Sequence, residues 1–180
     1  FTSTSIDATK LSGALPAIDG SALTGVGGGL PDYMHVRDEK AVGTAGGANV
    51  VGIQTRTLNT VVTNTITGAS LASNQVTLPS GTYRFKARLP TYRVELAKGY
   101  LYNITTSALA LSGSPVQAGS ATDVQIDSWV SGRLVIAGTT VFELRHQTHT
   151  VKATNGLGVA VNVAATGVEV FASLEIFKEA

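Results

Sequence analysis

β-branched residues, interrupted by frequent turn residues, dominate the chain from Tyr33 to its end. The 180 residues include 23 Thr and 20 Val, and the branched side chains of these residues favour strands over helices. Turn signals such as Pro79-Ser80-Gly81 and Ala137-Gly138 separate runs of about six to ten residues. Helical periodicity is missing from any window longer than about ten residues. Many short strands at this spacing predict an all-β, antiparallel sandwich or barrel.

Other glycine-containing positions predict further turns in the same region. They are Gly46-Gly47, Lys98-Gly99, Gly113-Ser114-Pro115, Ser131-Gly132 and Asn155-Gly156. Between the turns we expect strands at 33–37, 50–58, 60–67, 82–89, 92–104, 121–129, 132–137, 140–149, 157–164 and 168–178. Loops at the far end of such a head, such as 112–120 and 152–156, are the ordinary place for variable binding residues.

Alternation of side chains within these strands predicts which residues face the core. One face of strand 82–89 carries Tyr83, Phe85, Ala87 and Leu89, and the other carries Arg84, Lys86 and Arg88. One face of strand 140–149 carries Phe142, Leu144 and His146, and the other carries Val141, Glu143, Arg145 and Gln147. The mostly apolar faces are expected to pack against each other between two sheets.

The last strand, 168–178, carries large aromatic residues on both of its faces. The apolar face comprises Val168, Val170, Ala172, Leu174 and Ile176. The second face holds Glu169, Phe171, Ser173, Glu175 and Phe177. A solvated face should not carry two phenylalanines, so we expect this face to meet a partner chain.

The first thirty residues contain a short repeat. The pattern Ile-Asp-x-Ser/Thr-x-Leu-Ser/Thr-Gly occurs at Ile6–Gly13 and again at Ile18–Gly25, twelve residues later. Each copy has only two large apolar residues, so it needs neighbouring repeats or identical chains to bury them. Gly27–Gly29 then forms a hinge. We therefore expect a stem over 1–30 and a head domain over 31–180; a flexible linker of low complexity is the alternative for the first segment.

Several of these segments resemble the C-terminal part of bacteriophage tail fibre and tail spike proteins. The stem segment reads KLSGALPAIDGSALTGV, and the head contains RTLNTVVTNTITGASLASNQVTLPSGTY, SGRLVIAGTTVFELRHQTHT and NGLGVAVNVAATGVEVFASLEIFKE in that order. The resemblance implies a jelly-roll head like that of tumour necrosis factor, assembled as a homotrimer after a short extended stem. It also implies assembly in the bacterial cytoplasm, a place in the virion, and attachment to a bacterial surface.

The chain departs from this family pattern at residues 84–96, which are unusually basic. Three interpretations of Arg84, Lys86 and Arg88 stay open: an anion site for phosphate or carboxylate groups, a trimer interface, and a plain solvated face. In the resembled fold this strand and the last strand both turn their second faces towards the trimer axis. The resemblance thus implies a trimer interface that comprises Arg84, Lys86, Arg88, Glu143, Arg145, Glu169, Phe171, Glu175 and Phe177.

Receptor-binding residues are predicted from aromatic and basic character. Carbohydrate sites often use aromatic platforms, and the single Trp129 lies between Ser128 and Ser131, either as a stacking residue or as part of the core. Arg93 and Lys98 are the basic residues that we add to it. Tyr92, Tyr100 and Tyr102 share one parity of the expected strand 92–104, which favours packing over a cleft.

Composition and the absence of certain motifs argue against several other functions. The chain has no cysteine for disulfides or thiolate sites, a net charge of +1 that gives no general attraction to nucleic acid, and no apolar run near the length of a membrane span. Glycosidases need two placed carboxylates and serine hydrolases a tight nucleophile turn, and neither pattern is found. We therefore expect no enzyme, no cofactor and no resident metal.

Residue spacing bears on two weaker candidate sites. His146 and His149 are three residues apart, which places them on opposite faces of one strand. A metal could then be shared only across a threefold axis, and packed or hydrogen-bonded histidines are the favoured interpretation. Asp123 and Asp127 fall on one face of a regular strand, as a solvated pair or, less favoured, as a calcium or carbohydrate contact.

The sequence as a whole predicts the trimeric, non-enzymatic head of a phage tail fibre. We expect it to bind a bacterial receptor, with a polysaccharide or lipopolysaccharide favoured over a protein. The alternative is a structural cap that trimerises a spike whose binding or depolymerase activity lies upstream. The chain begins at Phe1 and its only methionine is Met34, so we expect it to be the end piece of a longer protein.

Overall fold

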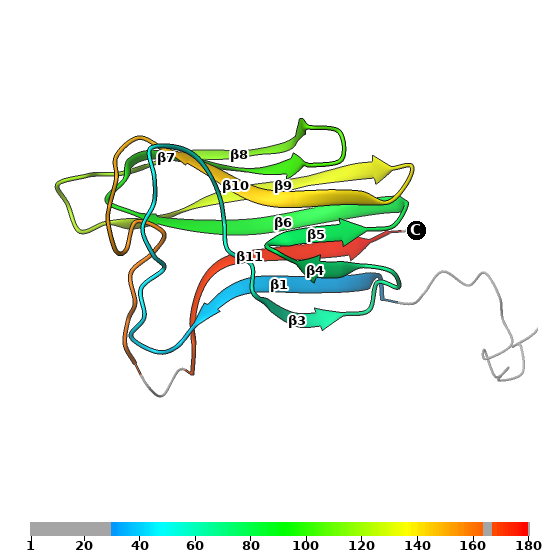
Figure 1. Ribbon diagram of the computed structural model, residues 1–180, viewed down its shortest axis with the longest axis horizontal. Coiled ribbons are helices and arrows are strands. Elements are labelled where there is room, and N and C mark those ends of the chain that lie inside the picture. Colours follow the sequence, from blue (N-terminus) through cyan, green and yellow to red (C-terminus); the bar gives the residue numbers. More distant parts are fainter. Residues whose placement is uncertain (1–29, 164–166, 180) are drawn as a thin grey trace, which may run out of the picture. The chain divides into compact units, whose positions relative to one another are not determined.

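Two antiparallel sheets packed face to face make up the part of the chain that the computed structural model describes, residues 30–163 and 167–179 (Figure 1). The strands are β1 (Asp32–Lys40), β2 (Gly52–Thr55), β3 (Thr60–Asn64), β4 (Ser70–Ala72), β5 (Gln75–Leu78), β6 (Gly81–Tyr92), β7 (Glu95–Asn103), β8 (Ala108–Ala118), β9 (Gln125–Ile136), β10 (Thr140–Thr148) and β11 (Glu169–Lys178). These described residues contain no helix that is long and apolar enough to cross a membrane. Residues 1–29 lie outside them, so the repeat stem and its glycine hinge stay predictions.

The strand order identifies the sandwich as a jelly roll. One sheet, called here the β11 sheet, has the order β3-β1-β11-β6-β9; the other, the β10 sheet, has the order β4-β5-β10-β7-β8, and β2 also pairs with β10. From β8 to β11 every connection crosses from one sheet to the other. The first and last strands, β1 and β11, lie side by side. The predicted all-β, antiparallel jelly-roll sandwich is confirmed.

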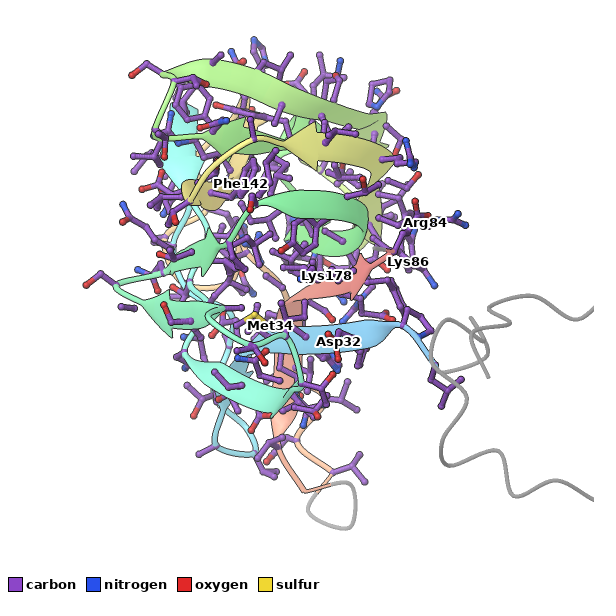
Figure 2. All side chains as sticks on the ribbon, turned by 90° about the vertical axis from the view of Figure 1, so that its right-hand side faces the viewer. Asp32, Met34, Arg84, Lys86, Phe142 and Lys178 are labelled. Carbon is purple, nitrogen blue, oxygen red and sulfur yellow. The ribbon has the colours of Figure 1, made fainter. Side chains whose placement is uncertain are left out.

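The core between the sheets is made by the alternation seen in the sequence. Tyr83, Phe85, Ala87 and Leu89 of β6 are all buried, as are Phe142, Leu144 and His146 of β10 and Ala172, Leu174 and Ile176 of β11. The rings of Phe85 and Phe142 lie 5.5 Å apart and join the two sheets. Figure 2 shows Phe142 inside the sandwich and Arg84 and Lys86 pointing away from it. Each large apolar side chain buried here stabilises the fold by about 1.5–3 kcal/mol.

Three predicted turns are wrong because their glycines lie inside strands. Gly99, Gly113 and Gly132 belong to β7, β8 and β9. A Cβ at Gly113 would lie 2.6 Å from the carbonyl oxygen of Gly99 and 2.7 Å from that of Trp129. A Cβ at Gly132 would lie 2.5 Å from the Leu111 side chain. Glycine is required here because the edges of the two sheets approach closely, and not because the chain turns.

Hydroxyl groups join the sheets at this same edge. The Ser128 hydroxyl accepts a hydrogen bond from the Gly99 backbone N–H at 2.8 Å and donates one to the Ser114 carbonyl at 2.6 Å. The Trp129 N–H donates to the Ser114 hydroxyl at 2.9 Å. These bonds satisfy backbone groups where β8 of one sheet meets β9 of the other, and the Gly99 N–H among them is buried.

Several strand boundaries also differ from the sequence prediction. The expected loop 112–120 lies mostly in β8, and the expected strands 121–129 and 132–137 are the single strand β9. The described part of 157–164 contains no strand. The expected strand 92–104 does not begin at Tyr92, because β6 runs to Tyr92 and the chain then turns through Arg93 and Val94 into β7. Arg93 and Glu95 adopt positive φ angles of 55° and 66° in this turn.

The connections of the sandwich gather at its two ends. One end, called here the loop end, carries the segments between β1 and β2, β6 and β7, β8 and β9, and β10 and β11 (Figure 1). The opposite end carries the start of β1 and the end of β11. Backbone bonds such as Arg93 N–H to Val124 O and Gly46 N–H to Gly158 O hold the loop-end segments together.

Candidate functional site

The outer face of the β11 sheet carries an ordered array of aromatic and charged side chains. The strand register aligns three rows across β1, β11, β6 and β9: Tyr33, Phe177, Arg84 and Arg133; His35, Glu175, Lys86 and Ser131; and Arg37, Ser173, Arg88 and Trp129. Five of the predicted interface residues, Arg84, Lys86, Arg88, Glu175 and Phe177, therefore lie together on one face. They share it because side chains two residues apart in a strand point to the same side.

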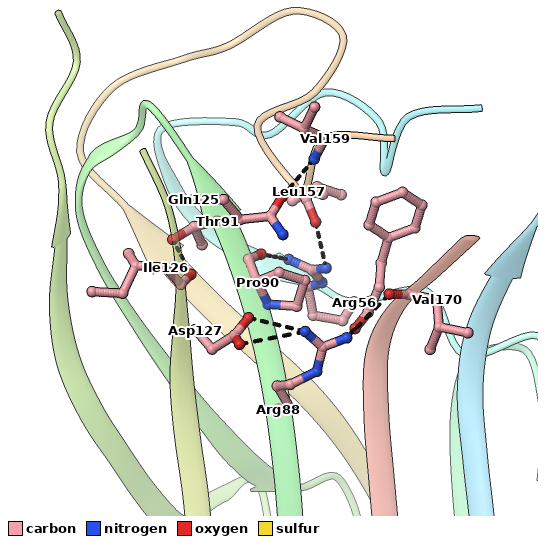
Figure 3. Close-up of polar contacts among 11 residues, drawn as sticks. Arg56, Arg88, Pro90, Thr91, Gln125, Ile126, Asp127, Leu157, Val159 and Val170 are labelled. Atoms are coloured by element: carbon pink, nitrogen blue, oxygen red, sulfur yellow. Dashed lines mark hydrogen bonds and ion pairs between the residues drawn. The ribbon is translucent and has the colours of Figure 1, made fainter. Parts of the chain in front are cut away.

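Two of the three predicted basic residues are paired within their own chain. Glu179 accepts hydrogen bonds from the Arg84 guanidinium at 2.7 Å and from Arg133 at 2.6 Å. These bonds, the one from Arg133 first, hold the pKa of Glu179 below its ordinary value. Arg88 contacts Asp127 at 3.3 Å and also donates to two backbone carbonyls of β11 (Figure 3).

Lys86 makes no ion pair with any residue of the described chain. Its ammonium lies 5.6 Å from the centre of the Trp129 ring, as a cation–π contact. Glu175 is its neighbour in the register, yet the carboxylate of Glu175 accepts a bond from the Tyr33 hydroxyl at 3.2 Å. Lys86 therefore presents a charge that no described residue neutralises.

An aromatic pair borders a hollow in the same face. The rings of Tyr33 and Phe177 lie 4.8 Å apart. Burial, together with the charge and hydrogen bond of Glu175, raises the pKa of Tyr33 to about 12. A hollow of about 390 Å³ is lined by Phe177, Ser131 and the cations Arg84, Lys86 and Arg133. The face combines apolar area with excess positive charge.

Phe171, which was expected from the sequence to contact a partner chain, is covered by its own chain. It is only 2% exposed, and the backbone of Gly158 covers it so closely that a Cβ there would lie 2.4 Å from the ring. The loop after β10 thus buries Phe171 within its own chain. Its presence on the second face of β11 needs no partner to explain it.

Glu143 and Arg145 lie on the outer face of the β10 sheet, so within one chain they cannot pair with the basic residues of β6. Glu143 accepts hydrogen bonds from Thr55, Gln75 and Arg145. Burial would raise the pKa of Glu143, but these three bonds outweigh it and lower the pKa. The Arg145 guanidinium lies 3.8 Å from the centre of the Tyr102 ring. Glu169 stands apart from both groups, at the loop end, where it accepts backbone N–H groups of Gly43 and Asn162.

The three predicted receptor residues do not come together. Trp129 is 46% exposed on the outer face of β9, the edge strand of the β11 sheet, so it is not part of the core. Lys98 lies on the outer face of β7, beside a hollow of about 320 Å³ that Leu96, Val116 and His149 also line. Arg93 lies in the turn between β6 and β7. They mark three separate places on the molecule.

The histidines also lie apart. His146 is buried, and neither of its ring nitrogens has a hydrogen-bond partner in the described part of the chain. Burial, followed by the charge of Arg56, lowers its pKa to about 3. His149 contacts Glu95 at 2.7 Å, and His35 contacts Ser173 at 2.9 Å. Among the described residues no group of three or more His, Cys, Asp or Glu is placed to hold a metal ion.

The loop end contains a hollow that the sequence did not predict. Tyr92, Asp123, Gln125, Val159 and Val161 line about 380 Å³ there; it is called here the loop-end hollow. The Tyr92 hydroxyl donates to Asp123 Oδ1 at 2.6 Å, and an Arg93 guanidinium N–H donates to the same oxygen at 3.1 Å. The Tyr92 hydrogen bond, followed by the Arg93 charge, lowers the pKa of Asp123. Asp123 and Asp127 thus belong to different ion pairs and do not form the expected pair.

A buried arginine holds one wall of this hollow in place (Figure 3). Arg56 is completely buried and donates to the carbonyls of Pro90 and Leu157, each at 2.9 Å. Next to it, Gln125 Oε1 accepts the Val159 N–H at 2.7 Å. Burial lowers the pKa of Arg56 to about 10, although the Asp38 charge opposes this. The sequence signal for this arrangement was weak, because Arg56 fell inside an expected strand and Tyr92 inside a stripe expected to pack.

Comparison with known proteins supports the fold and nothing finer. No protein-family model and no curated protein matches the chain. Murine APRIL, crystallised at pH 8.0, is 9% identical with a TM-score of 0.53, over 82% of this chain and 98% of its own; at pH 5.0 its TM-score is 0.55. The globular domain of zebrafish complement 1qA protein is 10% identical over 84% of this chain and 98% of its own, with a TM-score of 0.48. The likeness to APRIL agrees with a jelly roll of the tumour-necrosis-factor-like kind.

Proposed function

We propose that this chain forms the homotrimeric head of a bacteriophage tail fibre that attaches the virion to a receptor on the bacterial surface. The protein would be made and assembled in the bacterial cytoplasm and carried in the virion. Its action is binding and not catalysis. The motif resemblance of the stem and head segments supports the phage assignment, and the jelly-roll fold is compatible with it.

The single observation that supports a trimer is the composition of the outer face of the β11 sheet. This face exposes Trp129 and leaves Phe177 half-buried at the centre of a sheet, where a monomer would ordinarily present polar side chains. On it Lys86 has no carboxylate partner among residues 30–163 and 167–179 and contacts the Trp129 ring. A second copy that covers the aromatic residues would remove this apolar area from water, and closed threefold symmetry would satisfy each copy in the same way. Three copies also multiply weak receptor contacts into avidity.

Two measurements on the full chain test the proposal. Light scattering coupled to size exclusion should give three times the 18.5 kDa of one chain. The fluorescently labelled protein should bind bacterial cells and compete with adsorption of the phage that carries it. A monomer would overturn the trimer; a trimer that neither binds cells nor competes would overturn attachment and favour the structural cap.

A further inference from the structure

The loop-end hollow combines a carboxylate, an amide and apolar walls within one small space. Asp123 is 80% exposed in its side chain. Its Oδ1 accepts from Tyr92 and Arg93, and no residue of the described chain donates to its Oδ2. Oδ2 is therefore available to accept a hydrogen bond from a ligand hydroxyl.

Gln125 supplies the complementary donor. The Val159 backbone N–H can only donate, so the atom of Gln125 that it contacts at 2.7 Å is the carbonyl oxygen. This fixes the orientation of the amide and leaves its NH₂ group without a partner in the described chain. An acceptor on Asp123 and a donor on Gln125 within one hollow match a pair of neighbouring hydroxyl groups.

The remaining walls suit the C–H face of a sugar ring. Tyr92 brings an aromatic ring, and Val159 and Val161 bring branched apolar side chains, of which Val161 is 73% exposed. Small-ligand sites combine apolar walls with a few fixed polar groups in this way. Tyrosine offers an apolar ring with a polar tip, and here Asp123 already holds that tip in place.

The charge of the hollow favours a neutral ligand. The Arg93 guanidinium is satisfied by Asp123 at 3.1 Å and by the Ser120 carbonyl at 3.1 Å. The opposite charges of Arg93 and Asp123 offset each other, and none of the described residues that line the hollow is a cation, although the charge of nearby Lys152 also lowers the pKa of Asp123. In contrast, Lys98 beside the hollow on the β10 sheet has no carboxylate partner within the described chain.

The hollow is also preorganised. Three hydrogen bonds hold the loop after β10 in place. Arg56 donates to the Leu157 carbonyl, the Tyr92 N–H donates to the Gly156 carbonyl at 3.1 Å, and Gln125 accepts from the Val159 N–H. Glu169 holds the continuing chain through the Val161 and Asn162 N–H groups. A rigid site loses less conformational entropy on binding than a mobile loop.

We propose that the loop-end hollow formed by Tyr92, Asp123 and Gln125 binds a neutral hexose or N-acetylhexosamine unit of a surface glycan. The inference rests on the proposed attachment function and names the site and the class of sugar that it takes. Asp123 and the Gln125 amide bind adjacent ring hydroxyls, while Tyr92, Val159 and Val161 contact the apolar face of the ring. The site lies at the end of the sandwich opposite the start of β1 and the end of β11 (Figure 1), where a surface glycan is accessible.

Nuclear magnetic resonance on the ¹⁵N-labelled full chain tests the site directly. The probes are the methyl glycosides of glucose, galactose, mannose and rhamnose, and N-acetylglucosamine, with glucuronic acid as the anionic comparison. At least one neutral sugar should shift the Gln125 side-chain NH₂ signal and the Tyr92 amide in a saturable way. The proposal is overturned when no neutral sugar moves these signals, or when only glucuronic acid binds and the shifts map to Lys98.

Three variants separate binding from folding. Gln125→Glu keeps an oxygen for the Val159 N–H but removes the amide donor, so sugar affinity should fall at least tenfold while the melting temperature stays close to that of the wild type. Tyr92→Ala should weaken binding to a similar degree. Lys98→Ala is the matched control on the other hollow and should bind as the wild type does. Equal affinity of Gln125→Glu and wild type would contradict the proposal.

Binding of the labelled chain to bacterial cells distinguishes this inference from the function on which it rests. If the wild type binds cells and Gln125→Glu and Tyr92→Ala do not, both stand. If the wild type and both variants bind cells equally, attachment stands and the loop-end hollow is not the site. If the wild type binds no cells, the attachment function itself fails.

Discussion

Three polar side chains, Asp38, Arg56 and His146, are completely buried in the interior of the sandwich. Burial raises the pKa of Asp38, although the charges of Lys40 and Arg56 oppose this. Arg56 is bonded to two carbonyls, whereas both nitrogens of His146 have no hydrogen-bond partner within the described residues. Buried polar groups are costly unless they are paired, so these residues make the stability of the head sensitive to pH and to substitution.

Lowering the pH should destabilise the protein through His146. Its folded pKa of about 3 lies below the unfolded value of 6.5, so between these values the unfolded chain binds a proton that the folded chain does not. The free energy of unfolding should then fall by about 1.4 kcal/mol per pH unit below about pH 6.5. Urea unfolding at pH 6.5 and pH 4.5 measures this. His146→Leu should lose the contribution and the exposed control His149→Gln should keep it; equal pH dependence in all three proteins would contradict the assignment.

Arg56→Met should destabilise the fold. The substitution leaves the carbonyls of Pro90 and Leu157 without their donor, at a cost of about 1–3 kcal/mol for each buried group. Thermal unfolding should show a melting temperature several degrees lower than the wild type. Lys98→Met, which removes an exposed cation, is the control and should melt within about a degree of it. A wild-type melting temperature for Arg56→Met would show that the bonds to the loop contribute nothing.

Glycines inside strands are the feature that decides the packing of the elements. Gly99, Gly113 and Gly132 lie where β7 and β8 of one sheet meet β6 and β9 of the other, and each faces a contact shorter than 3 Å for an added Cβ. Ser128 and Ser114 bond across the same edge. The edge strands therefore cover each other's backbone and leave less of it open to unwanted pairing.

Gly113→Ala should weaken this edge. Its Cβ would meet two backbone carbonyl oxygens and the Val130 side chain, all within 2.8 Å, and overpacking of this kind costs about 1–3 kcal/mol. Gly138→Ala is the matched control, because a Cβ there meets nothing within 4 Å. Chemical denaturation of both variants measures the difference. Equal stability of the two would contradict the close approach of the sheets.

At the scale of the whole molecule, the outer face of the β11 sheet determines whether copies associate. The aligned rows place Tyr33 and Phe177 beside Arg84, and Lys86 beside Glu175. Because Arg84 and Arg88 are paired within the chain, the apolar residues and not the arginines are expected to supply most of the association energy. Exposed ion pairs contribute only about 0–1 kcal/mol.

Phe177→Arg should dissociate the proposed trimer. The substitution removes an aromatic side chain from the interface and adds a cation next to Arg84 and Arg133. Light scattering should report a mass near 18.5 kDa, one third of the wild-type value. Gln147→Arg adds the same charge on the outer face of the β10 sheet, where Gln147 is exposed, and should leave the mass unchanged. A stable trimer of Phe177→Arg would place the interface elsewhere.

Much of the sandwich was predictable from local pattern. The period-two alternation in β6, β10 and β11 assigned most of the core residues correctly, because a strand places every second side chain on the same face. Val168 is the exception, since it precedes β11 and is 41% exposed. The same rule placed Arg84, Lys86, Glu175 and Phe177 on outward faces. The turns at Pro79-Ser80 and Ala137-Gly138 were also predicted correctly, since both lie between strands.

The loop-end hollow was not predictable in the same way. Tyr92 comes from β6, Asp123 precedes β9, and Val159 follows β10, so their contacts join segments far apart in the sequence. Glycine posed the same difficulty, because it permits a turn and also permits close approach, and the residue alone does not distinguish them. In its strand Phe171 has no evident partner, and only the folded structure shows that the loop at Gly158 covers it.

By itself the sequence determined the secondary structure type, the inward and outward faces of the main strands, and the motifs that resemble phage fibres. These follow from local geometry, which each strand carries with it. Only the tertiary structure decided that Glu143 and Phe171 do not belong with the outward cations, that Arg56 holds a loop from inside, and that Tyr92, Asp123 and Gln125 share a hollow. These follow from which strands pair and which loops fold back over them, and that depends on contacts between distant residues.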